Sequence, residues 1–193
     1  MEQMEEWQQI AKRIHSFLER HGERKDARKK EMLIRQGERG ECLYLIEKGI
    51  VRGFYLDENG NEVTKCFSFD GDLACTECFL KEEEATFSVE CIKDCRMIAI
   101  SYEDLRQAMR KEPQLYQAMM YFYRKAYLQM EERQRTMLMQ DARERYLTFL
   151  KDFGEKGRWI PSIYLASYIH VNPSTLSRIR GILRKEAEEN ENT

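Results

Sequence analysis

The side chains best suited to chemistry gather near the C-terminus, on a predicted helix that begins at Pro173. Its outward side displays hydroxyl and guanidinium groups, which belong to Ser174, Thr175, Ser177, Arg178, Arg180 and Arg184. Arginine can donate two hydrogen bonds to guanine in the major groove, and serine and threonine can reach phosphates or bases. The free amides at the start of the helix offer a further phosphate contact. This face predicts a surface that binds double-stranded DNA.

Two short helices separated by a turn would position these groups. Pro161 and Ser162 open the first helix, residues 170–172 form the turn, and a recognition helix runs over residues 173–184. Helices of about eight and twelve residues around such a turn match a helix-turn-helix motif. We add Ser162 and Asn172, which lie at the helix starts, to the predicted DNA-contacting set.

Apolar residues inside the motif would hold the two helices together. Ala166 is small where the helices must cross closely, and four further residues would lock the second helix in place: Val171, Leu176, Ile179 and Leu183. The alternative is an ordinary helical hairpin with a solvated basic face.

Charge is distributed to suit a DNA-binding surface at this end of the chain. The whole protein has a net charge of −2, with 32 Lys and Arg against 34 Asp and Glu. Between residues 140 and 185, nine Lys or Arg stand against four Asp or Glu, whereas residues 31–110 hold ten against seventeen. The positive field that neutralises phosphates therefore lies where the motif lies.

A β-rich segment runs from Glu31 to about Ser101, with roughly seven or eight short strands separated by turn-forming or charged residues. This pattern predicts a compact antiparallel barrel or sandwich. The clearest turn is at residues 57–60, because Asn59 and Gly60 tolerate the positive φ of a hairpin turn. Ser101 predicts the N-cap of the helix that follows.

Helices are expected on both sides of this segment. Residues 4–28 predict one amphipathic helix, and residues 103–153 are helical with a single break at Pro113. The long helix after Pro113 carries two neighbouring apolar stripes. One would pack on the barrel and the other on the same helix of a second copy, which gives a two-fold dimer. The predicted dimer interface comprises Tyr116, Met119, Met120, Tyr123, Tyr127, Met130 and Met137.

The alternative to this dimer is one wide apolar stripe packed wholly inside a single subunit.

A β-barrel, a long helix and a C-terminal helix-turn-helix together resemble the Crp/Fnr family of bacterial transcription regulators. The most specific segments are IRQGERGECLYLIEKGIVRGFYLDENGNEVTKCFSFDGDL and LASYIHVNPSTLSRIRGIL. The resemblance implies an α+β fold: an antiparallel, jelly-roll-like β-roll sensor domain over residues 1–112, a dimerisation helix over 113–138 and a winged helix-turn-helix domain over 139–193. It also implies a homodimer that binds a near-palindromic operator, contacts RNA polymerase and places Arg178 at a base-contacting position.

The resemblance further implies an effector pocket in the β-roll, at Gly71, Asp72, Leu73, Thr86, Ser88, Tyr123 and Tyr127. Members that bind cyclic AMP pair a Gly-Glu step with an Arg-Ser step further along the chain. Here Gly71 and Asp72 resemble the first step, but Ala85 and Thr86 stand in place of the second. A cyclic phosphate beside the three glutamates at 82–84, with no arginine, would be repelled. We therefore expect that cyclic AMP is not the effector; a pocket for a different ligand and an empty, structural β-roll are both open.

The cysteines and histidines suggest no metal centre and no cofactor. Residues 1–41 hold no cysteine, so the N-terminal iron–sulfur ligands of oxygen-sensing relatives are missing. Cys75 and Cys78, with Cys91 and Cys95, could form a zinc or cluster site or a redox disulfide, but we expect six free thiols. All three histidines lie outside residues 31–101, which argues against a β-roll enzyme with clustered histidine ligands.

Other function classes lack supporting residues. No phosphate-binding loop, nucleophile elbow or H-E-x-x-H motif is present, so we expect no enzyme. No apolar stretch reaches the ~20 residues of a membrane span, and the acidic start has no signal core. We expect a cytoplasmic protein without a membrane partner. The alternative to DNA binding is a small-ligand sensor that signals through protein contact.

Overall fold

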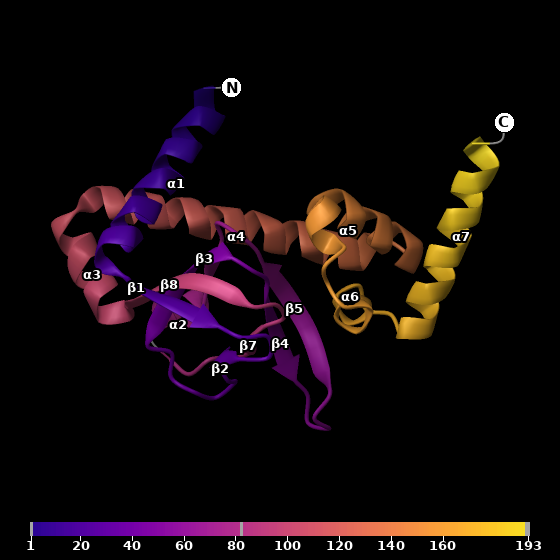
Figure 1. The fold of residues 1–193 in the computed structure, drawn as a ribbon, viewed down its shortest axis with the longest axis horizontal. Coiled ribbons are helices and arrows are strands. Elements are labelled where there is room, and N and C mark those ends of the chain that lie inside the picture. Colours follow the sequence, from indigo (N-terminus) through magenta and orange to yellow (C-terminus); the bar gives the residue numbers. More distant parts are fainter. Residues whose placement is uncertain (1, 82, 192–193) are drawn as a thin grey trace.

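A β-roll, a long helix and a helical C-terminal part follow one another along the chain (Figure 1). The computed structural model describes residues 2–81 and 83–191. The fold is α+β, with an antiparallel β-roll in the N-terminal half, as the sequence predicts. None of the helices in these two ranges combines the length and the apolar character that a membrane span needs.

The β-roll is built from two antiparallel four-stranded sheets. One has the strand order β1-β8-β3-β6 and the other has the order β2-β7-β4-β5. The strands are β1 (Glu23–Ala27), β2 (Met32–Ile34), β3 (Cys42–Lys48), β4 (Val51–Leu56), β5 (Glu62–Ser68), β6 (Leu73–Ala74), β7 (Ser88–Cys91) and β8 (Cys95–Ser101). A short helix, α2 (Thr76–Lys81), lies between β6 and β7.

The hairpin between β4 and β5 forms where the sequence predicts it. The carboxylate of Asp57 accepts hydrogen bonds from the backbone N–H groups of Asn59 and Asn61, at 2.9 and 2.8 Å. Gly60 has a φ of 79°, which glycine adopts without the steric penalty of a side chain. The turn therefore sets the pairing of Leu56 with Glu62.

The N-terminal helix is shorter than expected. α1 covers Glu2–His21, and the residues after it form β1, which pairs with β8. Gly22 allows the turn, because a Cβ there would lie 2.4 Å from the side chain of Ile98. The prediction of helix to residue 28 was wrong because β1 is polar and shows no apolar alternation; its pairing with β8 decides its structure.

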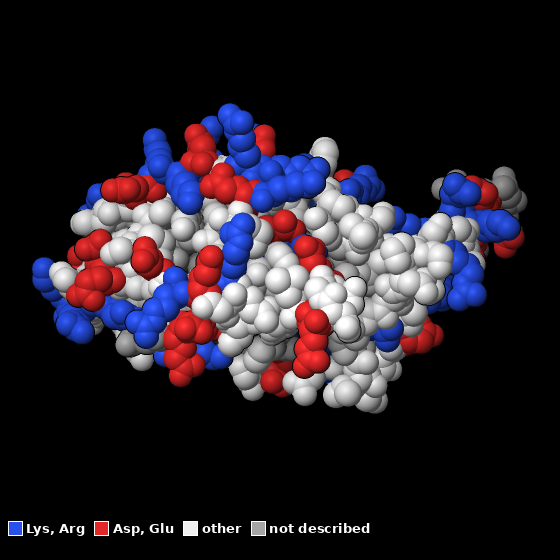
Figure 2. Space-filling model, turned by 90° about the horizontal axis from the view of Figure 1, so that it is seen from below, with Lys and Arg blue, Asp and Glu red and all other residues white. Residues whose placement is uncertain are grey.

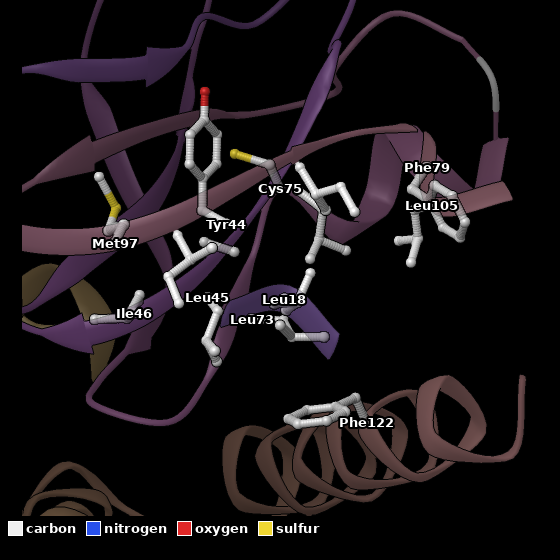
Figure 3. Close-up of a cluster of buried hydrophobic side chains, with 14 of the residues drawn as sticks. Leu18, Tyr44, Leu45, Ile46, Leu73, Cys75, Phe79, Met97, Leu105 and Phe122 are labelled. Carbon is white, nitrogen blue, oxygen red and sulfur yellow. The ribbon is translucent and has the colours of Figure 1, made fainter. Parts of the chain in front are cut away.

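Apolar side chains from the roll and from two helices form the main core (Figure 3). Leu45, Ile46 and Met97 come from the strands, Leu18 from α1 and Phe122 from the helix labelled α4 (Pro113–Met139). One side of α4 thus packs on the β-roll, as one of the two predicted stripes requires.

The helices after the roll break at two places, whereas the sequence predicts one. The hydroxyl of Ser101 caps α3 (Tyr102–Lys111) as expected, and Pro113 begins α4. A second break follows Met139. There Asp141 and Glu144 form a capping box that starts α5 (Ala142–Gly157). The expectation of unbroken helix from Pro113 to residue 153 was wrong because a local N-cap outweighs the helical propensity of the flanking residues.

The C-terminal part contains α5, α6 (Ser162–Tyr168) and α7 (Pro173–Glu191). Gly154 adopts a φ of 48° and kinks α5, and α7 extends beyond the predicted end at residue 184. Residues 139–191 contain no strand, so the wing implied by the resemblance is not found in this stretch. The physical reason is length: helices take up this stretch except for residues 140–141, 158–161 and 169–172, and each of these connections is too short for a two-stranded ribbon.

A second apolar core joins the C-terminal helices to the β-roll. Phe67 and Phe69 from β5 and the residues after it pack with Phe149, Phe153 and Tyr168, whose ring centroids lie 4.8 to 6.2 Å apart. α6 lies beside β5 (Figure 1). The helix-turn-helix segment therefore does not stand apart from the roll but shares a core with it.

Candidate functional site

The turn between α6 and α7 determines where α7, the predicted recognition helix, begins. The side-chain oxygen of Asn172 accepts hydrogen bonds from the backbone N–H of Thr175 and from the hydroxyl of Ser174, both at 2.7 Å. Asn172 therefore acts as the N-cap of α7, and Pro173 follows at the first helical position, where an N–H has no partner to lose. Three residues of the predicted DNA-contacting set thus meet at the start of one helix.

Buried residues hold α7 against α6 as the sequence predicts. Leu165 and Ala166 of α6 and Leu176 and Ile179 of α7 are buried, and Val171 packs beside them. The backbone N–H of Val171 donates to the carbonyl oxygen of Ala166 at 3.0 Å, which closes the turn. The small Ala166 lies at the crossing, where a larger side chain would separate the two helices.

The outward side of α7 presents free polar groups. Ser177, Arg178 and Arg184 are exposed. Arg184 lies 3.8 Å from the carboxylate of Glu188, one turn further along. Within residues 2–81 and 83–191 no hydrogen bond or ion pair holds Arg178. Its guanidinium is therefore free to bind an acceptor outside the protein.

Arg180 behaves differently from Arg178. Its guanidinium donates to the hydroxyl of Tyr146 on α5 at 3.1 Å and to the hydroxyl of Ser162 on α6 at 2.7 Å. Arg180 and Ser162, both predicted to contact DNA, are thus bound to each other and tie the three C-terminal helices together. Their role in the free protein is to position α7.

Two arginines that the sequence analysis did not single out brace the motif. Arg145 donates to the carbonyl oxygens of Ile169 at 2.8 Å and of Gln140 at 2.7 Å. Arg133, on α4, donates to the carbonyl oxygen of Tyr168 at 2.9 Å. No sequence signal could have found them, because each partner is a backbone group brought close only by the fold.

Lys and Arg side chains lie at the end of the molecule that carries α7, at the right in Figure 2, together with some Asp and Glu. The excess of Lys and Arg is limited to residues 140–185, because Glu186, Glu188, Glu189 and Glu191 follow in the last turns of α7. A phosphate backbone that approaches the N-terminal half of α7 would meet the exposed Arg178.

Comparison with known proteins agrees with this architecture. The family model of the cyclic nucleotide-binding domain matches residues 24–112. The cAMP-activated global transcriptional regulator CRP of Salmonella typhimurium is 33% identical over 87 residues, which cover 45% of this chain and 41% of that protein. The aligned part thus spans less than half the length of this curated relative.

Solved structures show that the likeness in fold extends over most of the chain. FixK2 of Bradyrhizobium japonicum has a TM-score of 0.79 at 19% identity, and the match covers 86% of both chains. The c-di-GMP responsive global regulator CLP of Xanthomonas campestris has a TM-score of 0.74 at 17% identity, covering 90% of this chain and 91% of that one. Residues 24–112 thus match the cyclic nucleotide-binding domain family, and most of the chain shares the fold of FixK2 and CLP.

In the β-roll, two of the predicted pocket residues are hydrogen-bonded to residues outside the predicted set. Asp72 accepts a hydrogen bond from the ammonium of Lys125 on α4 at 2.7 Å, and Ser88 accepts one from the backbone N–H of Gln36 at 2.9 Å. Leu73 is buried, Tyr123 is half-buried and Tyr127 is exposed on α4. Asp72 and Ser88 are therefore already hydrogen-bonded within the subunit, and Leu73 and Tyr123 are wholly or partly covered.

Thr86 has an internal acceptor of its own. Its hydroxyl donates to the carboxylate of Glu77 at 2.7 Å, and its backbone N–H donates to the same carboxylate at 3.2 Å. Burial opposes ionisation of Glu77, but hydrogen bonds from Thr86 and Lys81 outweigh it and lower the pKa of the carboxyl. The hydroxyl and the backbone N–H of Thr86 are thus both bound to a negatively charged carboxylate.

A small cavity of about 150 Å³ lies elsewhere in the roll. It opens between β2 and β3, beside Cys42, Tyr44 and Cys75, and none of the predicted pocket residues lines it. The sequence analysis missed it because its walls come from β2 of one sheet, β3 of the other and the segment that joins them.

The cysteines do not form a metal site in the part of the chain that is described. All six are free, and residues 2–81 and 83–191 hold no cluster of three or more Cys, His, Asp or Glu placed to bind a metal ion. Burial raises the pKa of both Cys75 and Cys78, so these thiols resist forming the thiolate that metals and oxidants need.

Cyclic AMP at about 1 mM is expected to leave the melting temperature unchanged, because a ligand must bind the folded state to raise it. Ala85 stands where cyclic-AMP-binding members carry arginine, and Glu77 would repel the phosphate. Thermal unfolding followed by circular dichroism measures the effect, with purified Salmonella typhimurium CRP as the positive control. A rise in melting temperature for this chain would contradict the prediction.

Proposed function

We propose that this protein is a homodimeric transcription regulator that binds a near-palindromic operator through α7. The observation that carries the proposal is the exposed face of Ser177, Arg178 and Arg184, with Arg178 unpaired among the described residues, on a helix held by Asn172 and Arg180. Arginine on a rigid recognition helix suits bidentate contact with guanine in the major groove. Related Crp proteins are transcription regulators, which supports the same role here.

Dimerisation would place two such helices on successive major grooves. α4 leaves a row of apolar side chains exposed on the side away from the roll: Tyr116 (57% exposed), Met120 (47%), Tyr127 (56%) and Met130 (56%). Pairing this row with a second copy would remove it from water. Met137 and Tyr123 lie at its edges. Met119 is fully buried within the subunit, so we leave it out of the proposed interface.

A selection experiment tests the proposal. The purified protein is incubated with a library of random duplexes, and bound sequences are amplified and measured by gel shift at two salt concentrations. We expect a site with two half-sites about 34 Å apart, one helical turn of duplex, and binding that weakens with salt. Absence of salt-dependent binding to any duplex would favour a sensor that signals through protein contact.

Replacing Arg178 with alanine should weaken binding to the selected site by about 1–3 kcal/mol while changing non-specific binding less. The guanidinium reads a base edge, whereas phosphate contacts elsewhere on the surface remain. Fluorescence anisotropy with selected and scrambled duplexes measures both affinities. Arg96→Ala, an exposed arginine on β8 of the roll, serves as the control and should bind like the wild type. Equal loss on both duplexes would mean that Arg178 contacts only the backbone.

The role of the β-roll and its partners follows from the same proposal. Asp72 and Ser88 accept hydrogen bonds from within the subunit, and the hydroxyl of Thr86 donates one to Glu77. We therefore propose that the roll either responds to a ligand other than cyclic AMP or serves as a structural platform. Contact with RNA polymerase and a location in the cytoplasm remain predictions that rest on the family resemblance.

A further inference from the structure

The most deeply buried charged side chain of the described residues lies at the boundary between the roll and α6. Arg52, on β4, is 1% exposed. Its guanidinium forms ion pairs with Glu90 on β7, at 2.7 Å, and with Glu62 on β5. A buried cation is strongly unfavourable without such partners, so the position of Arg52 is determined by both strands.

The faces of the same guanidinium contact two aromatic rings. Its central carbon lies 4.2 Å from the ring centroid of Phe54, within β4, and 3.7 Å from that of Tyr164, on α6. A planar guanidinium over an aromatic face gains a cation–π attraction, which is strongest when water is excluded. The edge of the Arg52 guanidinium therefore forms ion pairs with strands of the roll, and one of its faces contacts Tyr164 on α6 of the helix-turn-helix.

Backbone contacts beside Arg52 align α6 with the edge strand β5. The backbone N–H of Thr64 donates to the hydroxyl of Ser167 at 2.9 Å, and this hydroxyl donates to the carbonyl oxygen of Glu62 at 3.3 Å. α6 thus covers an edge that would otherwise leave peptide groups unpaired. A shift of β5 or of Arg52 would move the first helix of the motif.

Strand β7 connects this contact to the inside of the roll. Glu90 lies two residues after Ser88, whose hydroxyl is buried and binds the backbone of Gln36. A rearrangement of β7 would therefore change the partner of Arg52 directly.

We propose that Arg52 is a positioning residue that couples the β-roll to the orientation of the helix-turn-helix through the ring of Tyr164. The rival explanation is that Arg52 only stabilises the roll. The two explanations differ in which segments exchange faster when the side chain is removed. If Arg52 couples the two parts, exchange accelerates in α6. If Arg52 only stabilises the roll, exchange also accelerates in β3 and β8.

Hydrogen–deuterium exchange of the full chain tests the coupling without DNA. Tyr164→Leu keeps Arg52 paired with both glutamates but removes the ring. We expect exchange in residues 162–168 to accelerate by about 30-fold, from the strength of a desolvated cation–π contact, with β3 and β8 unchanged. Tyr164→Phe keeps the ring and loses only the hydroxyl, which interacts with Glu90, so as the matched control its exchange should stay much closer to the wild type than that of Tyr164→Leu.

Arg52→Met gives the reciprocal test where the variant folds. Combined with Tyr164→Leu it should accelerate exchange in α6 no more than the larger single variant does, because both remove the same contact. Unchanged exchange in residues 162–168 for Tyr164→Leu would overturn the proposal, as would acceleration by Tyr164→Phe equal to that by Tyr164→Leu. Acceleration spread equally over α6, β3 and β8 would also overturn it.

A DNA measurement extends the test and rests on the proposed function. Tyr164→Leu should raise the Kd for the selected operator about tenfold, because an unanchored reading helix loses its preorganisation. If the wild type binds no duplex, the proposed function fails, but the exchange experiment still decides whether Arg52 couples the two parts.

Discussion

Replacing Met120 and Tyr127 together with glutamate is expected to convert a dimer into monomers. In a two-fold interface each residue lies near its own copy in the other subunit, so two substitutions place four negative charges at the seam. Charges that lose water without a partner strongly oppose association. Light scattering coupled to gel filtration should show the mass of one subunit in place of two.

The affinity for the operator should fall when the dimer dissociates. Each subunit would bind its half-site alone and lose the effective concentration that linkage provides, so affinity should drop by about 100-fold or more. Gln129→Glu is the control, because Gln129 is exposed on the opposite side of α4. A double variant that stays dimeric would place the subunit interface elsewhere.

Replacing Phe149 with alanine is expected to lower the free energy of unfolding by about 3–5 kcal/mol, the usual range for a buried phenylalanine. Phe149 is 2% exposed, and its ring lies 4.8 Å from that of Phe153 and 5.9 Å from that of Tyr168. The cavity would lie in the core shared by α5, α6 and the roll. Urea unfolding followed by circular dichroism measures the loss.

The exposed Leu147 on the same helix provides the comparison. Leu147→Ala removes a side chain of similar character from water instead of from the core, so it should change stability by less than about 1 kcal/mol. Equal losses for the two variants would mean that the shared core contributes little and that the C-terminal helices fold independently of the roll.

The two cores together fix the position of α7 relative to the β-roll and α4. One core joins α1, the roll and α4, and the other joins the roll to α5, α6 and α7. The roll contacts both the proposed dimer helix and the proposed DNA-binding motif. Lys125 with Asp72 forms the first of these links, and Arg52 with Tyr164 forms the second.

Local sequence patterns predicted the helix-turn-helix and the hairpin well. Pro173, the spacing of Ala166 and Leu176, and the pair Asn59-Gly60 each act within a few residues of their own position. Such signals are visible in one sequence because their physical cause, a fixed φ, a missing N–H or a helical repeat, is contained in the segment itself.

Features that depend on residues far away along the sequence could not be predicted. β1 has a polar sequence and becomes a strand through its pairing with β8. Met119 looked like an interface residue and is buried in the subunit, because the rotation of α4 on the roll decides which stripe faces inward.

The sequence by itself determined that this protein has a β-roll, a long helix and a C-terminal helix with an arginine face. Only the tertiary structure decided which arginines are free and which are bound. Arg178 faces outward, Arg180 ties three helices together, and Arg52 is buried between the roll and α6. The physical reason is that hydrogen bonds, ion pairs and ring contacts depend on distances in space, and residues such as Thr64 and Ser167, far apart along the chain, meet only when it is folded.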